Sequence, residues 1–168
     1  MPISHKATSQ RATSPRSDLD EIRFRIRSGR QQGHFYVALL GLRTYQSLEL
    51  IEQVRKGFRY STFVRFQRNT SLSVKTLSEM VQIRSRTLTR RKEEGKLDPE
   101  ESDRLLRASR VFGRALELFE GDDEAARGWL SSAQPALGGL APLEVARSDV
   151  GAKEVENLIG RLENGIPS

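Results

Sequence analysis

The sequence predicts an all-α protein. Apolar residues recur at spacings of three and four, acidic residues gather where such segments begin, and glycine follows where they end. No segment of any length alternates between apolar and polar residues as a half-buried strand would. We expect a disordered basic tail over residues 1–32, a helical region containing a helix-turn-helix over 33–97, and a small C-terminal helical domain over 98–168.

Composition argues against an enzyme. A chain of 168 residues with 36% hydrophobic content can fill one or two small cores. Cysteine is absent, and the two histidines, His5 and His34, have no partner in a ligand spacing, so we expect no disulfide, metal site or catalytic triad. No phosphate-binding loop or nucleophile motif is present. We therefore predict no cofactor and no small-molecule substrate.

The chain also lacks an apolar run of membrane-spanning length, and its basic, Ser/Thr-rich start has no apolar signal core. We predict a cytoplasmic protein with no membrane partner.

The charge of the chain changes sign along its length. Residues 1–60 carry eleven basic and five acidic side chains, residues 61–97 nine and three, and residues 98–168 eight and fourteen. A basic first part favours a polyanionic partner, and an acidic second part favours a partner other than DNA. A chance distribution of charge over solvated faces remains the alternative.

The first elements are short. Residues 1 to about 20, rich in Ser, Thr, Arg and Pro, predict the tail. Phe35–Leu40 is an apolar run whose period cannot distinguish a helix from a strand. A helix follows over 47–56, with Ser47 as its N-cap and Gly57 beyond its end. We expect one apolar stripe on it, formed by Leu48, Ile51 and Val54.

Three further helices predict a helix-turn-helix: Tyr60–Arg68, one capped by Ser73, and one over 84–92 that ends at Gly95. The second helix should bury Val74, Leu77, Met80 and Val81, with Leu77 and Val81 packing against Ile83 and Leu88. Ser85, Arg86, Thr89 and Arg90 then face outward. We predict the following DNA-contacting residues: Arg84, Ser85, Arg86, Thr87, Thr89, Arg90, Arg91 and Lys92.

Two observations leave that prediction open. A helix of basic residues is often no more than a solvated surface. Gln82 also stands in the turn, where glycine is common, so that either Gln82 has an ordinary conformation or the turn is wider than usual.

The C-terminal part begins with a strong helix start. Asp98 is a cap, Pro99 takes the first position and Glu101 can reach back to the cap, which predicts a helix to about Phe119. A second helix opens at 122–124 and contains Trp129 and Leu130. A loop over 135–142, a short helix over 143–146 and a final helix after Gly151 complete the prediction.

A family resemblance emerges from these residues. The string Trp129-Leu130, then Pro135-Ala136-Leu137-Gly138-Gly139, then Pro142-Leu143-Glu144 resembles the toxin-binding domain of Xre/ParS-type antitoxins, and Ile83-x-x-Arg86-Thr87-Leu88 resembles their helix-turn-helix region. The resemblance covers about residues 37–166. Gln82, the polar Asn69-Thr70-Ser71 and Asn164 depart from the family pattern.

The resemblance implies an antitoxin of a type II toxin–antitoxin system. Its partner would be a RES-domain toxin, a class thought to deplete NAD, and it would form a homodimer that represses its own operon at operator DNA. It also implies the following toxin-binding residues: Trp129, Leu130, Leu137, Gly138, Gly139, Pro142, Leu143, Arg161, Asn164, Gly165, Ile166, Pro167 and Ser168.

Other interpretations of these residues stay open. Trp129, Leu130, Leu137 and Leu143 are more often core than interface, and Gly138-Gly139 is by default a turn. A stand-alone helix-turn-helix regulator with a C-terminal dimerisation domain is the alternative function. The neighbouring gene separates the two, because an antitoxin gene should lie beside the gene of its toxin.

Overall fold

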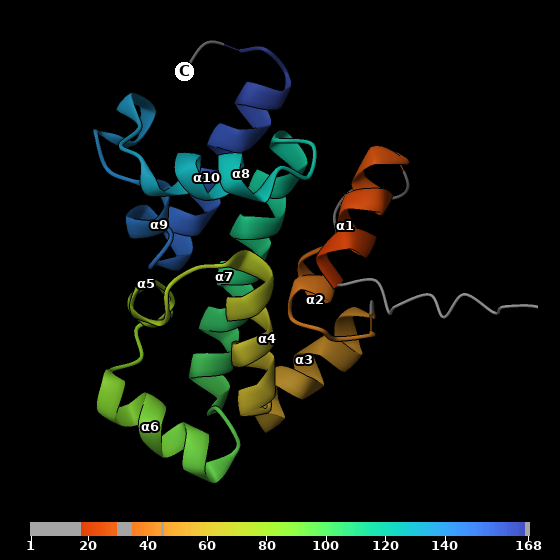
Figure 1. Ribbon diagram of the computed structural model, residues 1–168. Helices are drawn as coiled ribbons and strands as arrows, with labels where there is room; N and C mark the ends of the chain where they lie inside the picture. Colours follow the sequence, from red (N-terminus) through yellow and green to blue (C-terminus); the bar gives the residue numbers. More distant parts are fainter. Residues whose placement is uncertain (1–17, 30–34, 45, 167–168) are drawn as a thin grey trace, which may run out of the picture.

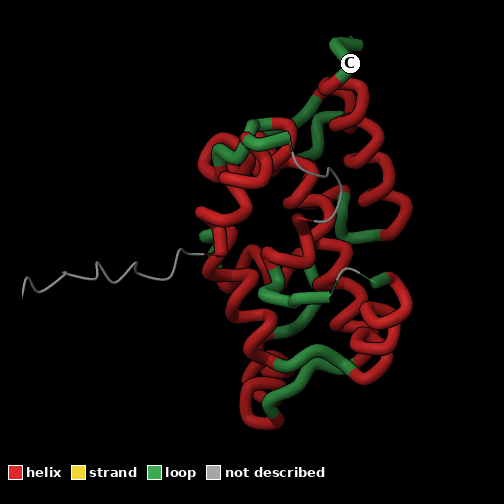
Figure 2. The backbone as a smooth tube through the Cα atoms, turned by 90° about the vertical axis from the view of Figure 1, so that its right-hand side faces the viewer, coloured by secondary structure: helices red, strands yellow, loops and turns green. Residues whose placement is uncertain are grey.

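The computed structural model describes residues 18–29, 35–44 and 46–166, and this part of the chain is all-α, as predicted (Figures 1 and 2). The described residues form no β-strand. The helices are α1 (Asp18–Arg27), α2 (Phe35–Leu39), α3 (Ser47–Lys56), α4 (Tyr60–Thr70), α5 (Val74–Met80), α6 (Ser85–Glu94), α7 (Pro99–Leu118), α8 (Asp123–Ser131), α9 (Pro142–Val145) and α10 (Asp149–Glu163), with a 3-10 turn, η1 (Pro135–Leu137).

Helix α7 is the axis of the molecule. It packs against α2, α3 and α4 on the N-terminal side and against α8 and α10 on the C-terminal side (Figure 1). Leu105, Phe112 and Leu116 on α7 are fully buried, and the ring of Phe112 meets that of Phe66 edge to face with centroids 6.2 Å apart. The buried residues form one continuous core, so α7 serves both parts that the sequence separates at Asp98.

The predicted cap of α7 is confirmed. The backbone N–H of Glu101 donates to Asp98 Oδ1 at 2.8 Å, and the N–H of Asp98 donates to Glu101 Oε2 at 2.9 Å. These bonds satisfy two donors that a helix start otherwise leaves without partners.

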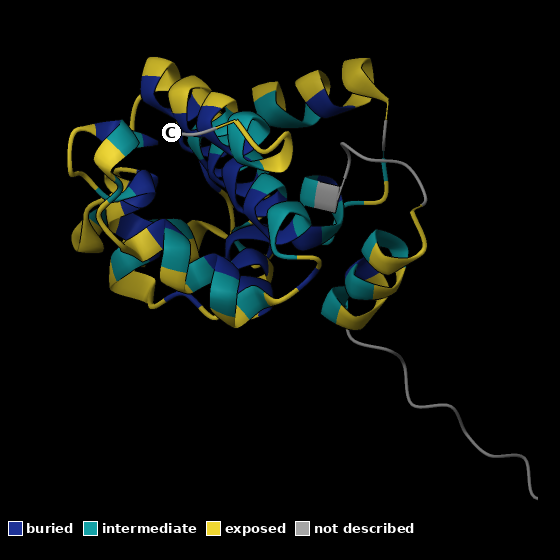
Figure 3. Ribbon diagram, turned by 90° about the horizontal axis from the view of Figure 1, so that it is seen from above, coloured by how far each residue is buried: buried dark blue, intermediate teal, exposed yellow. Residues whose placement is uncertain are grey.

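The predicted tail over 1–32 is wrong for residues 18–27, which form α1. Ile22 is fully buried, and the other residues of the helix are half-buried or exposed (Figure 3). Residues 1–17 and 30–32 of that prediction lie outside the described residues. The sequence did not predict α1 because this helix buries only Ile22 and so shows no apolar periodicity. Tertiary contacts stabilise it instead.

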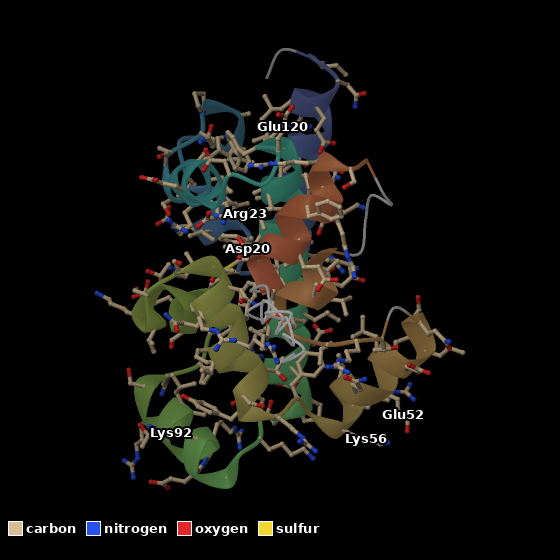
Figure 4. The ribbon with its side chains drawn as sticks, turned by 45° about the vertical axis from the view of Figure 1, so that its right-hand side comes forward. Asp20, Arg23, Glu52, Lys56, Lys92 and Glu120 are labelled. Carbon is tan, nitrogen blue, oxygen red and sulfur yellow. The ribbon has the colours of Figure 1, made fainter. Side chains whose placement is uncertain are left out.

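Ion pairs hold α1 against both parts of the molecule. Asp18 accepts from Arg65 Nε of α4 at 2.6 Å. Arg23, labelled in Figure 4, donates to the Gly121 carbonyl at 3.2 Å and pairs with Asp123. The hydrogen bond from Arg65 lowers the pKa of Asp18. Burial acts to raise the pKa of Asp123, but hydrogen bonds from Arg127 and Arg23 outweigh it, and the net shift is downward.

The undecided run Phe35–Leu40 is largely helical, and α3 has the predicted span. Two details of α3 were predicted wrongly. Its N-cap is Gln46, not Ser47, and its buried residue is Leu50, whereas Leu48 is 81% and Ile51 49% exposed. Val54, the third residue of the predicted stripe, is half-buried and packs against the core, so the stripe is wrong for Leu48 and Ile51 only.

The last helix begins before Gly151, contrary to the prediction. Ser148 is its N-cap, and the N–H of Gly151 donates to Ser148 Oγ at 3.0 Å. A Cβ on Gly151 would lie 1.8 Å from the Val145 carbonyl oxygen, so a side chain there would force α9 and α10 apart. None of the described helices is long and apolar enough to cross a membrane.

Candidate nucleic-acid interface and C-terminal binding surface

Helices α5 and α6 form the predicted helix-turn-helix. Leu77, Val81, Ile83 and Leu88 are buried, as the sequence indicated, and Ser73 Oγ caps α5 by accepting from the N–H of Thr76 at 3.0 Å. Val74, which was expected to be buried, is 51% exposed. It lies in the first turn of α5, before the helix reaches the core.

Neither expectation for Gln82 is correct. The turn is tight, and Gln82 adopts the left-handed conformation with φ +55°, which glycine adopts more easily. Its side-chain Nε2 donates to the Arg147 carbonyl at 3.2 Å, and Arg147 also pairs with Glu79 at 3.6 Å. The side chain of Gln82 thus bonds the turn of the motif to the segment between α9 and α10. Glycine, which has no side chain, could not form this bond.

The outer side of α6 carries most of the predicted DNA-contacting residues. Ser85, Arg86, Thr89 and Arg90 are exposed, and so is Arg84 at the N-cap. Lys92, near the end of the helix, is exposed as well (Figure 4). Thr87 is half-buried. Thr89 Oγ1 donates to the Ser85 carbonyl at 3.1 Å, which leaves its oxygen as an acceptor on this surface.

Arg91 has a different environment. Its side chain is 15% exposed and pairs with Glu94 at 2.9 Å, Asp98 at 2.6 Å and Glu101 at 2.7 Å. Hydrogen bonds from its guanidinium, first to Glu101 and then to Glu94, raise the pKa of Arg91 well above its ordinary value. Arg91 therefore connects α6 to the start of α7 and has little of its guanidinium left for a phosphate.

Ion pairing separates the helix-turn-helix from the C-terminal part more clearly than net charge does. Residues 59–96 contain ten Lys and Arg, of which Arg65, Arg90 and Arg91 pair with a carboxylate. The other seven form no ion pair with any described acidic residue: Arg59, Arg68, Lys75, Arg84, Arg86, Lys92 and Lys96.

Residues 98–168 behave in the opposite way. Of their eight cations, only Lys153 lacks an ion pair within the described chain. The positive charge of the helix-turn-helix is thus left for a partner, whereas that of the C-terminal part is neutralised internally.

Four predicted toxin-contacting residues lie beneath the C-terminal surface instead of on it. Leu130 is fully buried, Leu137 is 8% and Leu143 7% exposed, and Pro142 is also buried. Trp129 is half-buried, with its ring 6.3 Å from that of Phe119 between centroids. These side chains support the surface from below, as the core interpretation of the same residues expected.

The loop above them is open. Gly138 and Gly139 have φ of +67° and +80°, and a Cβ on either would meet no atom within 4 Å. The next residue, Leu140, is 52% exposed. The backbone N–H of Gln134 donates to the Leu140 carbonyl at 3.1 Å, and this bond joins the two ends of the loop. Sequence reasoning missed Leu140 because an apolar residue in an apolar stretch gives no signal of exposure.

The predicted C-terminal contacts lie on and after α10. Arg161 pairs with Glu154 at 3.3 Å, and Asn164 Nδ2 donates to the Gly160 carbonyl at 2.6 Å. Asn164 therefore caps the end of α10. Gly165 and Ile166 are exposed, Ile166 by 52%, while Pro167 and Ser168 lie outside the described residues.

Comparison with known proteins places both sites in one family. Residues 49–110 match the antitoxin Xre-like helix-turn-helix domain, and residues 114–165 match the antitoxin Xre/MbcA/ParS C-terminal toxin-binding domain. An antitoxin Xre of Yersinia enterocolitica is 34% identical over 128 residues, which are 76% of this chain and 86% of that protein. The chain belongs to the Xre antitoxin family. As an Xre-type antitoxin it is a non-enzymatic protein that binds a toxin through its C-terminal domain and carries a DNA-binding helix-turn-helix.

Other Xre antitoxins are similar over smaller shares. The antitoxin Xre of Photorhabdus laumondii is 40% identical over 74 residues, 44% of this chain and 50% of that protein. The antitoxin Xre of Pseudomonas putida is 26% identical over 118 residues, 70% and 72% of the two chains. The two domain matches end and begin at residues 110 and 114, inside α7, the helix whose packing joins the two parts.

Proposed function

We propose that this antitoxin neutralises a RES-domain toxin that depletes NAD, and that it represses its own operon in the cytoplasm by binding operator DNA. The proposal rests on the resemblance of the sequence to antitoxins of that system. The observation that carries it is the contrast between the mostly unpaired cations of residues 59–96 and the paired cations of the C-terminal domain. Two surfaces of different charge suit two different macromolecules.

Operator binding would use the outer side of α6. Arg86 and Arg90, which are exposed, would contact base edges, and the exposed Ser85, Thr89 and Lys92 would assist them. We expect Arg86→Ala with Arg90→Ala to abolish binding to a duplex from the promoter while toxin neutralisation persists. Simultaneous loss of both activities would contradict this division of labour.

Toxin binding would use the open loop at Gly138–Leu140, the half-buried Trp129 and the segment after α10. The test is co-expression with the product of the neighbouring gene, followed by growth and cellular NAD. We expect rescue by the full chain, and reduced rescue when residues 165–168 are deleted. Unchanged inhibition after the deletion would remove the C-terminal segment from the interface.

Trp129→Ala should also free the toxin, but truncating a core aromatic costs roughly 3–5 kcal/mol. A thermal melt must therefore accompany that assay. A variant that keeps its melting temperature and loses the toxin would place Trp129 in the interface itself.

A homodimer would use α3. Leu48 and Ile51 are exposed on it, Glu49 and Glu52 come first along it, and Arg55 and Lys56 follow at its end. Two copies related by a two-fold axis would pair these helices antiparallel, so that the acidic residues of each meet the basic residues of the other. Leu48→Ser with Ile51→Ser should yield monomers in light scattering, and a wild-type dimer that survives this change would place the interface elsewhere.

The alternative of a stand-alone regulator is not supported, because residues 114–165 match the antitoxin Xre/MbcA/ParS C-terminal toxin-binding domain.

A further inference from the structure

A basic groove lies beside α6, between its C-terminal end and the start of α4. It has a volume of about 530 Å³ and is lined by Arg59, Tyr60, Ser61, Val64, Arg65, Arg68, Lys92 and Gly95. The two ends are bonded together, because the N–H of Tyr60 donates to the Gly95 carbonyl at 2.9 Å and that of Leu97 donates to the Phe58 carbonyl at 2.8 Å. In Figure 1 the loop that leaves α6 runs up beside the lower end of α4 to the start of α7.

The groove is uniformly positive. Arg59, Arg68 and Lys92 are exposed and form no ion pair with a described carboxylate, and no acidic residue contributes to the lining. Arg65 differs, since it pairs with Asp18 at 2.6 Å. Water solvates these three cations, none of which forms an ion pair within the described chain, and an extended polyanion can replace that water.

The floor of the groove suits a sugar–phosphate strand. Val64 is 46% exposed, and Tyr60 lies half-buried with its ring stacked on that of Phe63 at 5.8 Å. These groups offer apolar surface for a deoxyribose, and the exposed Ser61 offers a hydroxyl for a phosphate oxygen.

The groove is also continuous with the outer side of α6. Ser85, Thr89 and Lys92 follow one another at spacings of four and three residues, which places them along one edge of the helix. Lys92 thus belongs both to α6 and to the groove lining. A DNA strand that leaves the major groove at α6 would meet the groove next.

We propose that this groove holds the DNA backbone flanking the site that α6 contacts, with Arg59, Arg68 and Lys92 bound to its phosphates. The inference rests on the proposed operator binding and adds α4 to the interface. Because phosphates are the same in every sequence, these residues contribute affinity and salt dependence without base discrimination.

The test is the affinity of the full chain for a promoter duplex and for an unrelated duplex of equal length, measured by fluorescence anisotropy over a series of KCl concentrations. Arg59→Ala with Arg68→Ala should weaken binding to both duplexes by about tenfold at low salt and reduce the slope of log K against log salt by about two. The ratio between the two duplexes should stay unchanged.

The matched control is Arg43→Ala with Lys153→Ala. These two cations are also exposed and without an ion pair in the described chain, and they lie outside the groove, so the control loses the same net charge. Rescue from the toxin reports whether each variant is folded.

The outcomes separate the inference from the proposal beneath it. If the groove variant binds like the control while Arg86→Ala with Arg90→Ala loses the promoter, the groove proposal is overturned and operator binding stands. If the wild-type chain binds neither duplex, both fail. A changed ratio between the two duplexes would also overturn the groove proposal, because it would mean that α4 contacts bases.

Discussion

Arginine serves two purposes in this antitoxin, and the two parts of the molecule divide them. In the C-terminal domain, Arg110 joins α7 to Glu156 of α10 at 3.1 Å, and Arg114 joins it to Glu163 at 2.8 Å. On the helix-turn-helix, Arg84 and Arg86 have no such partner in the described chain. The net charge of a segment does not show this difference, because a binding partner interacts with the charges that are not already neutralised by ion pairs within the fold.

The most severe test of this contrast is whether the two parts fold separately. Phe112→Ala should lower the free energy of unfolding by roughly 3–5 kcal/mol, because it leaves a cavity in the one core that both parts share. We expect a single urea transition for the wild type and the variant, by far-UV circular dichroism and by Trp129 fluorescence. Two transitions that separate in the variant would mean that α7 does not couple the parts.

Neighbouring arginines on α6 offer a sharper test. Arg91→Ala should cost roughly 3 kcal/mol of stability, since it leaves Glu101, whose side chain is 5% exposed, without its cation. Arg90 is 60% exposed and lies 3.7 Å from Glu94, so Arg90→Ala should change the stability by less than about 0.5 kcal/mol.

Operator affinity should follow the reverse order for these two variants when both are measured under conditions where they are folded. Equal effects of the two variants on stability and on DNA binding would mean that exposure of the guanidinium does not separate structural from DNA-binding cations.

The turn of the motif gives a smaller effect. Gln82→Gly should relieve the strain of the left-handed backbone, which stabilises the chain by about 1 kcal/mol. The loss of the hydrogen bond to the Arg147 carbonyl offsets part of that gain. Gln82→Ala keeps the strain and loses the bond, so it should be destabilising. Thermal melts of the two variants test this. A lower melting temperature for Gln82→Gly than for the wild type would mean that the hydrogen bond to Arg147 outweighs the backbone strain.

The smallest expected effect is the response of α1 to acid. Asp18 and Asp123 have pKa values lowered from 3.8 in the folded chain, so their ion pairs contribute stability above that value and lose it as the pH falls through the folded-state pKa. Arg23→Gln with Arg65→Gln should therefore be less stable than the wild type at pH 7, with the difference shrinking below about pH 4. A difference independent of pH would mean that these arginines act through packing alone.

Local chemistry determined much of this protein from the sequence. Asp98, Pro99 and Glu101 specify the start of α7 through their own hydrogen bonds and ring geometry, and Gly95 specifies the end of α6 through its left-handed backbone. The buried face at Leu77, Val81 and Leu88 also follows from spacing alone, because a helix fixes which residues share a side. These features, together with the family motif, were sufficient to predict the helix-turn-helix and the all-α class.

Only the tertiary structure decided which of several similar residues does what. Nothing local distinguishes Arg91 from Arg90, or Leu50 from Leu48, since each pair shares a residue type and a helix. Helix α7 brings Glu101 to Arg91 and packs against α3, where Leu50 is buried. Arg90 and Leu48 remain in water. Burial and ion pairing depend on what distant segments bring to a side chain, and that information lies in packing rather than in any one stretch of the chain.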